Sequence, residues 1–201
     1  MGVQVSEVSI CNQGLSWLGQ DSIASLEDDS DTAKLCKANY GPLRDAVLTE
    51  VAWTFATGRL ISITADLDDW GQRYKHAIPH DWLQVLRVYR NVSSDRKLKS
   101  DGWVREGSFI LSKDATVYMW GIKRIADTSL FSPAFAQCLA ARIAADICVG
   151  VTENLTLQGT MYQLYGAKLK EAAISDGIQG SNEVIESNTL IDARSGSGFG
   201  Y

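Results

Sequence analysis

The sequence predicts an α+β protein, because segments with helical periodicity lie at both ends of the chain and β-rich segments lie between them. Residues 1–58 and 128–175 are expected to form one α-helical bundle. Residues 59–127 are expected to form a small antiparallel β insertion, and residues 176–201 an extended C-terminal arm. The chain has 201 residues, of which 45% are apolar, so it can bury a sizeable core.

Two helices are predicted before the β insertion. From Val5 to Gly19, apolar residues recur at three- and four-residue spacing, and the glycine can end the helix. Asp28-Asp29-Ser30-Asp31 offers N-cap candidates and negative charge at the start of a second helix, which is expected to run to about Thr57. Proline lacks an amide donor and clashes with the preceding turn, so Gly41-Pro42 predicts a kink or a fresh helix start.

The middle of the chain contains β-rich runs separated by turn residues such as Pro79, Asn91 and Asp114. These runs predict about four short strands that form a small antiparallel sheet or an open barrel. The expected strands cover residues 60–64, 82–89, 103–111 and 116–122.

Two further helices are predicted after the β insertion. Ser132-Pro133 combines a cap with a proline at the first helical position, and an apolar stripe follows it, interleaved with alanines that permit close packing. A break is expected near Gly150, and the last helix is expected to end by Gly177. The segment after it has too few apolar residues to fold alone, so it is either a disordered tail or an arm that orders along a partner. Its apolar pairs, Val184-Ile185 and Leu190-Ile191, favour the arm.

Composition and charge restrict the classes of function. The formal net charge of −5 does not indicate nucleic-acid binding, although an acidic channel could let a DNA duplex slide through without sticking. No apolar run approaches the roughly 20 residues of a membrane span, and the N-terminus lacks a signal-peptide pattern, so we expect an intracellular product that is not in a membrane. The cysteines contain no C-x-x-C pair and are predicted to be buried free thiols: Cys11, Cys36, Cys138 and Cys148.

Candidate catalytic and metal-binding groups are sparse. His76 and His80 are four residues apart, but Pro79 between them argues against the helix that would bring both to one metal, so a surface or structural role is expected. A Cys–His nucleophile using Cys36 or Cys138 has no local support. Residues 66–70 lack calcium-loop spacing and predict a solvated loop. The basic stretch Arg87, Arg90, Arg96, Lys97 and Lys99 is read as a solvated hairpin loop or a subunit contact, with nucleic-acid binding as the alternative.

Four stretches in a fixed order carry a resemblance to a known family. The first is the helix and turn at residues 15–26, including Leu18-Gly19 and Ser25-Leu26. The second is residues 33–56, which close on Trp53-Thr54-Phe55-Ala56. The third is residues 74–86, which contain Ile78-Pro79-His80-Asp81-Trp82-Leu83, where Trp82 replaces the usual small residue. The fourth runs from Phe131-Ser132-Pro133 through Ala140-Ala141-Arg142-Ile143-Ala144. In this order they resemble the head-to-tail adaptor family of tailed bacteriophages, which includes tail tubular protein A of T7-like phages and the portal-proximal adaptor of P22-like phages.

This resemblance implies a virion structural protein and not an enzyme, with no catalytic site, cofactor or metal. It implies a helical bundle with a β insertion, assembled as a ring, twelve-fold like the portal, between the portal protein and the tail nozzle or tube. Double-stranded DNA would pass through the ring as a passenger only. The chain would be made in the host cytoplasm, and its C-terminal arm would bind the portal through the apolar residues Val184, Ile185, Leu190, Ile191, Phe199 and Tyr201. Three alternatives stay open: another connector or tail-completion protein, a small hydrolase accessory, and a DNA-binding module.

Overall fold

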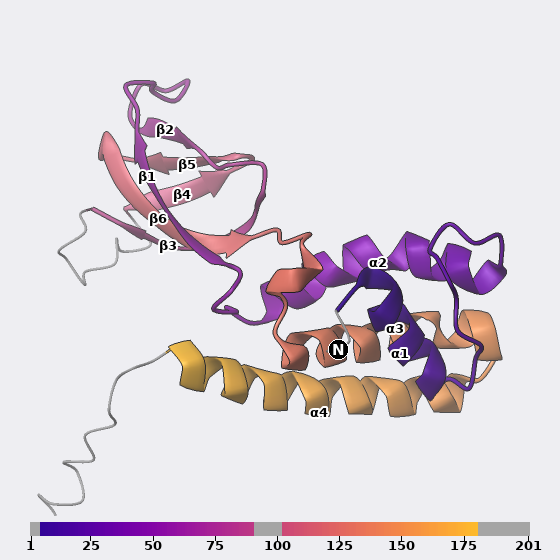
Figure 1. The fold of residues 1–201 in the computed structure, drawn as a ribbon. Helices are drawn as coiled ribbons and strands as arrows, with labels where there is room; N and C mark the ends of the chain where they lie inside the picture. The colour runs from indigo at the N-terminus through magenta and orange to yellow at the C-terminus, as the bar shows by residue number, and fades with distance from the viewer. Residues whose placement is uncertain (1–4, 91–101, 181–201) are drawn as a thin grey trace, which may run out of the picture.

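Residues 5–90 and 102–180 are described by a computed structural model, and within them helices and antiparallel strands form an α+β fold, as predicted (Figure 1). Helices α1 (Glu7–Trp17) and α2 (Asp31–Glu50) come first, and α3 (Pro133–Thr152) and α4 (Leu155–Gly180) come last. A short 3₁₀ turn, η1 (Thr128–Leu130), leads into α3. Between the two helix pairs lie the strands β1 (Thr57–Ile63), β2 (Tyr74–Ala77), β3 (Trp82–Tyr89), β4 (Trp103–Glu106), β5 (Phe109–Ser112) and β6 (Thr116–Lys123).

The helices begin where side-chain caps satisfy free backbone amides. Ser30 caps α2 by accepting from the amide of Ala33. Ser132 caps α3, and Pro133 occupies its first turn, which confirms the predicted start. Gly19 also ends the first helix as predicted, because its φ of +67° places it in the left-handed region that glycine adopts freely.

Two expectations about α2 are decided at its middle and its end. Of the kink or fresh start expected at Gly41-Pro42, the fresh start does not occur, since the helix is continuous through Pro42 and buries both Tyr40 before the proline and Val47 after it. It ends at Glu50 and not near Thr57. Trp53 is fully buried there and donates its indole N–H to the carbonyl of Val47 at 2.9 Å, so the chain must turn inward directly after the helix.

The predicted boundaries of the last two helices also need correction. Gly150 lies inside α3, and the break falls at Glu153, which has a φ of +54°. Helix α4 then continues past Gly177 to Gly180, so residues 176–180 of the predicted extended arm are helical. The reason is a tertiary contact. The buried Asp176 carboxylate accepts hydrogen bonds from the amide and the hydroxyl of Thr54, at 2.8 and 3.0 Å.

The β insertion contains two three-stranded sheets, in the orders β1-β6-β3 and β2-β5-β4, where about four strands in one sheet or open barrel were expected. The run at residues 103–111 is a hairpin and not one strand, because Gly107, with a φ of +56°, turns the chain between β4 and β5. Strand β2 was missed. The two sheets share an apolar core in which Ile110 of β5 packs with Val88, Val117 and Met119 of the other sheet.

Helix α3 is the centre of the helical part, since α1, α2 and α4 all pack against it (Figure 1). Four of its alanines, Ala140, Ala141, Ala144 and Ala145, are fully buried. At Gly14 of α1 the approach is so close that a Cβ atom there would lie 2.8 Å from the carbonyl oxygen of Ala140. All four cysteines are buried free thiols in this core, as predicted.

By length and apolar composition alone, α3 could cross a membrane, so the expectation that no stretch approaches a span was too strict. In the structure 61% of the most apolar 18-residue stretch of this helix is buried by the rest of the protein. A core helix buried on most sides has the same composition as a membrane span. Among the described residues, it is the one helix of this kind.

We predict that Gly14→Ala lowers the free energy of unfolding by about 1–3 kcal/mol, because the new methyl group would force α1 away from the backbone of α3. Gly159→Ala is the matched control in α4. Its Cβ would meet nothing within 4 Å, so alanine should stabilise the helix by about 0.5–1 kcal/mol. Urea unfolding measures both changes. Equal effects of the two substitutions would contradict the close approach of α1 to α3.

Candidate functional site

The outer surface of the sheet β1-β6-β3 gathers aromatic, aliphatic and arginine side chains from three strands. Strand register places Arg59 and Arg87 on either side of Trp120, and Ile61 and Tyr89 on either side of Tyr118. Ile63 lies on the same face at the end of β1. We call this surface the arginine–aromatic face; it consists of Arg59, Ile61, Ile63, Arg87, Tyr89, Tyr118 and Trp120.

The arginine–aromatic face is open to solvent. Ile61 is 56% exposed and Ile63 is 75% exposed. The guanidinium of Arg87 lies 5.0 Å from the centre of the Trp120 ring, which is a cation–π geometry. Arg59 has no ion pair within the part of the chain that the structure describes. Strands β1, β3 and β6 contain no Asp or Glu, so the face carries positive charge beside apolar surface.

A cleft joins this face to the end of α4. Its volume is about 650 Å³, and its lining includes Arg59 and Trp120 from the sheet together with Asp176 and Gly177 from the helix. The bonds from Thr54 to Asp176 hold the helix end beside the start of β1. The cleft therefore lies about one helical turn before residue 181.

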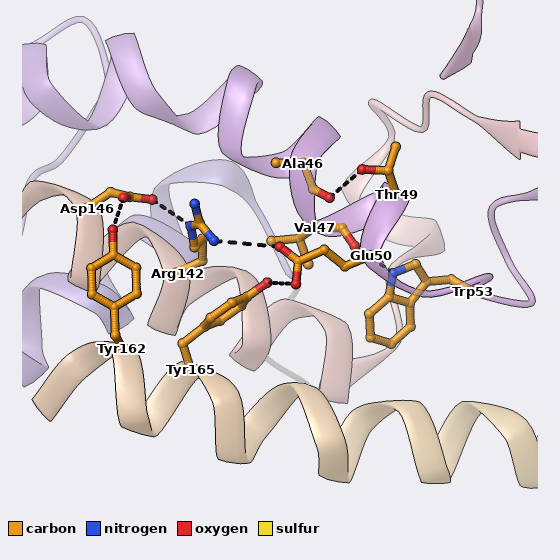
Figure 2. A network of polar contacts seen from close by, with 9 residues as sticks. All are labelled: Ala46, Val47, Thr49, Glu50, Trp53, Arg142, Asp146, Tyr162 and Tyr165. Carbon is orange, nitrogen blue, oxygen red and sulfur yellow. Dashed lines mark hydrogen bonds and ion pairs between the residues drawn. The ribbon is translucent and has the colours of Figure 1, made fainter. Parts of the chain in front are cut away.

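A network of charged and phenolic groups fixes α4 against α2 and α3 (Figure 2). Arg142 of α3 contacts Asp146 at 2.6 Å and Glu50 of α2 at 3.6 Å. From α4, Tyr165 donates its hydroxyl to Glu50 at 2.7 Å, and Tyr162 donates to Asp146. Every carboxylate oxygen of Glu50 and Asp146 has a partner, so the network holds α4 in a fixed position against α2 and α3.

The pKa directions agree with this structural role. Burial, reinforced by the hydrogen bond to Glu50, raises the pKa of Tyr165 well above its usual range. The hydrogen bond to Asp146 likewise raises the pKa of Tyr162. Burial alone would lower the pKa of Arg142, but the hydrogen bond to Asp146 and the charge interactions with Asp146, Tyr165 and Tyr162 together outweigh burial, so the pKa rises. The phenols stay protonated and the guanidinium stays charged at neutral pH, so the contacts hold.

The structure does not bring together the candidate catalytic groups. His76 is buried in the β insertion, with its ring nitrogens 3.0 Å from the Ser62 hydroxyl and 2.9 Å from the Asp114 carbonyl, which is the structural role expected. His80 is exposed. Cys36 and Cys138 lie in the helical core, a separate part of the molecule, and burial raises the pKa of the Cys138 thiol to about 12. A protonated, buried thiol is a poor nucleophile.

The loop at residues 66–70 is a tight turn, in which the carboxylate of Asp68 accepts hydrogen bonds from the backbone amides of Gln72 and Arg73. These bonds lower the pKa of Asp68. Trp70, at the tip of the turn, is 85% exposed. The loop is solvated, as predicted, and presents a large aromatic ring.

Of the basic stretch, Arg87 stacks on Trp120, and Arg90 pairs with Asp114 at 3.2 Å. Arg96, Lys97 and Lys99 lie outside the described residues. The six predicted portal-binding residues, from Val184 to Tyr201, also lie outside them. The arginine–aromatic face was not predicted, since it depends on pairing strands far apart in the sequence.

No protein-family model matches the chain, and no curated protein matches it.

We predict that Tyr165→Phe lowers the free energy of unfolding by about 1.5–3 kcal/mol, because the buried Tyr165 ring loses its hydrogen bond to the charged carboxylate of Glu50. Tyr162→Phe is the matched control at a more exposed position and should cost less than about 1 kcal/mol. Chemical denaturation compares them.

The same variant tests the pH dependence. The native pKa of Tyr165 lies above its unfolded value of about 10. The stabilisation that comes from the protonated Tyr165 is therefore fully present below about pH 10, and it is lost as the pH rises from there through the native pKa. Tyr165→Phe should flatten the alkaline fall in stability; an unchanged fall would show that the phenol does not hold its proton in the fold.

Proposed function

We propose that this chain is a virion structural protein of a tailed bacteriophage, a head-to-tail adaptor that forms a ring between the portal and the tail nozzle or tube. The ordered resemblance of residues 15–26, 33–56, 74–86 and 131–144 to that family motivates the proposal. In it, the helices form the bundle, the two sheets form the insertion, and the residues after α4 form the portal-binding arm. The ring is twelve-fold to match the portal, and the DNA passes through as a passenger.

The observation that best supports this proposal is the last part of α4. Ile174 and Ile178 are 67% and 73% exposed, one turn apart on the same side of the helix. They lead directly to the apolar pairs of residues 184–185 and 190–191. A helix end with exposed isoleucines, followed by a segment that contains two apolar pairs, fits a region that is covered by a partner.

A ring also needs two different complementary surfaces on each subunit, because a head-to-tail contact joins unlike patches. The exposed Trp70 turn and the arginine–aromatic face are both at the β insertion, away from α1 and the start of α4 (Figure 1). Aromatic and arginine side chains are enriched at the energetic centres of protein interfaces. Both surfaces fit contacts with neighbouring subunits or with the tail nozzle.

The rival functions predict different results. Another connector or tail-completion protein would also form assemblies, but would not bind the portal. A hydrolase accessory needs a nucleophile or a carboxylate free to exchange protons, and the carboxylates of the Arg142 network are committed to partners. A DNA-binding module would be retained on duplex DNA with an affinity that falls steeply with salt.

Deleting residues 181–201 should abolish binding to the portal protein encoded by the same genome, while the fold stays intact. The cut must follow Gly180, because deletion from residue 176 would also remove Asp176 and its bonds to Thr54. Co-sedimentation with purified portals and electron microscopy of the mixture measure binding.

The matched point variants are Val184→Ser with Ile185→Ser, expected to weaken portal binding at least about tenfold, and Ser187→Ala with Thr189→Ala, expected to leave it unchanged. Full portal binding by the deletion variant would refute the proposed role of residues 181–201 in binding the portal. A chain that binds no portal in its complete form would refute the adaptor function itself.

A further inference from the structure

The arginine–aromatic face is an apolar, positively charged surface that nothing in the described residues covers. Ile61 and Ile63 are among the most exposed large apolar side chains, and the three strands supply no acidic group to balance Arg59 and Arg87. Proteins rarely leave a contiguous surface of this kind open to water. Its chemistry fits an extended segment that is both apolar and acidic.

The chain itself contains such a segment, and it starts beside the face. Asp176 and Gly177 line the same cleft as Arg59 and Trp120, and α4 ends three residues later at Gly180. Residues 181–201 then follow. Fully extended, a segment of this length spans about 70 Å, so it can reach every part of the face.

The segment also complements the face in charge and pattern. It carries Glu183, Glu186 and Asp192 against a single Arg194. In extended backbone, residues i and i+2 point to the same side. Val184 then shares a side with Glu186, and Leu190 shares one with Asp192, as Arg59 and Ile61 do on β1. An apolar–acidic row can therefore lie against an apolar–cationic row.

We propose that residues 181–201 bind the arginine–aromatic face of their own chain, so that the free subunit keeps this face covered. The tether makes the contact intramolecular, with an effective concentration in the millimolar range. The aliphatic Ile61 and Ile63 offer nothing to a phosphate backbone, which favours this peptide over a nucleic acid. The contact goes beyond the proposed function and needs no portal, so it is tested on the chain alone.

The test is amide hydrogen exchange of the full-length protein, read over residues 184–192. We expect these amides to exchange at least about tenfold more slowly than in the free synthetic peptide 181–201. Arg59→Glu with Arg87→Glu should remove this slowing. Adding Glu186→Arg and Asp192→Arg, the two acidic positions of the apolar–acidic row, to that variant should restore it, because the charges are then exchanged. The matched control is Arg105→Glu, an exposed arginine on β4 of the other sheet, which should leave the slowing intact.

The amides of α3 report in the same experiment whether each variant is folded. If the double arginine variant unfolds, Ile61→Ser with Ile63→Ser tests the same face without changing its charge, and it should also remove the slowing. Absence of slowing in the natural chain overturns the proposal, as does slowing that persists in the folded variants. Slowing that grows with protein concentration would also overturn it, because the contact would then be with a second copy. Binding of a single-stranded oligonucleotide to this face in the natural chain would overturn it too, because the face would then be open.

Discussion

The close packing of α3 is the constraint on which the rest of the molecule depends. Its alanines let three helices approach it, and at Gly14 the approach leaves no room for a methyl group.

The start of α3 extends this core toward the sheets. Phe135 contacts Trp53 with ring centres 5.1 Å apart and Phe131 at 4.7 Å, and Phe55 packs on Phe135 as well. These aromatic rings come from both connections between the helices and the β insertion. The insertion is thereby anchored to the end of the most buried helix, and Arg124 beyond β6 adds an ion pair with Asp45 of α2 at 2.7 Å.

The polar contacts on α3 and α4 determine where the chain leaves the fold. The Arg142 network holds the first half of α4, where Tyr162 and Tyr165 reach Asp146 and Glu50. Asp176 holds its second half, through Thr54. Since β1 begins at Thr57, this second contact places the last turns of α4 beside the outer surface of the sheet β1-β6-β3 (Figure 1). The exposed isoleucines of α4 and the arginine–aromatic face therefore lie at the same end of the molecule.

Helix boundaries set by neighbouring residues could be predicted from the sequence, whereas features set by contacts between distant residues could not. The start of α3 and the end of α1 were predictable because Ser132-Pro133 and Gly19 act on their own neighbours. The end of α2 depends on the burial of Trp53, and the end of α4 on Thr54, which is 122 residues from Asp176. Nothing near Pro42 or Gly177 reveals these contacts. The arginine–aromatic face likewise requires the pairing of Arg59 with Trp120. Within the network only Arg142 and Asp146, at i and i+4, carry a local signal that could have been recognised.

The position of the arginine–aromatic face has a consequence for assembly. If residues 181–201 cover this face in the free subunit, they cannot contact a portal through the same apolar side chains at the same time. A portal that binds the segment must then expose the face, and a neighbour that binds the face must release the segment. Such coupling is reciprocal, because each partner shifts the equilibrium by its preference for one of the two states. Subunits in solution would present neither surface, and subunits on a portal would present the face to the next subunit. Because α4 ends beside β1, the segment that follows it can block this face in a free subunit. Ring contacts through the face would then form mainly between portal-bound subunits.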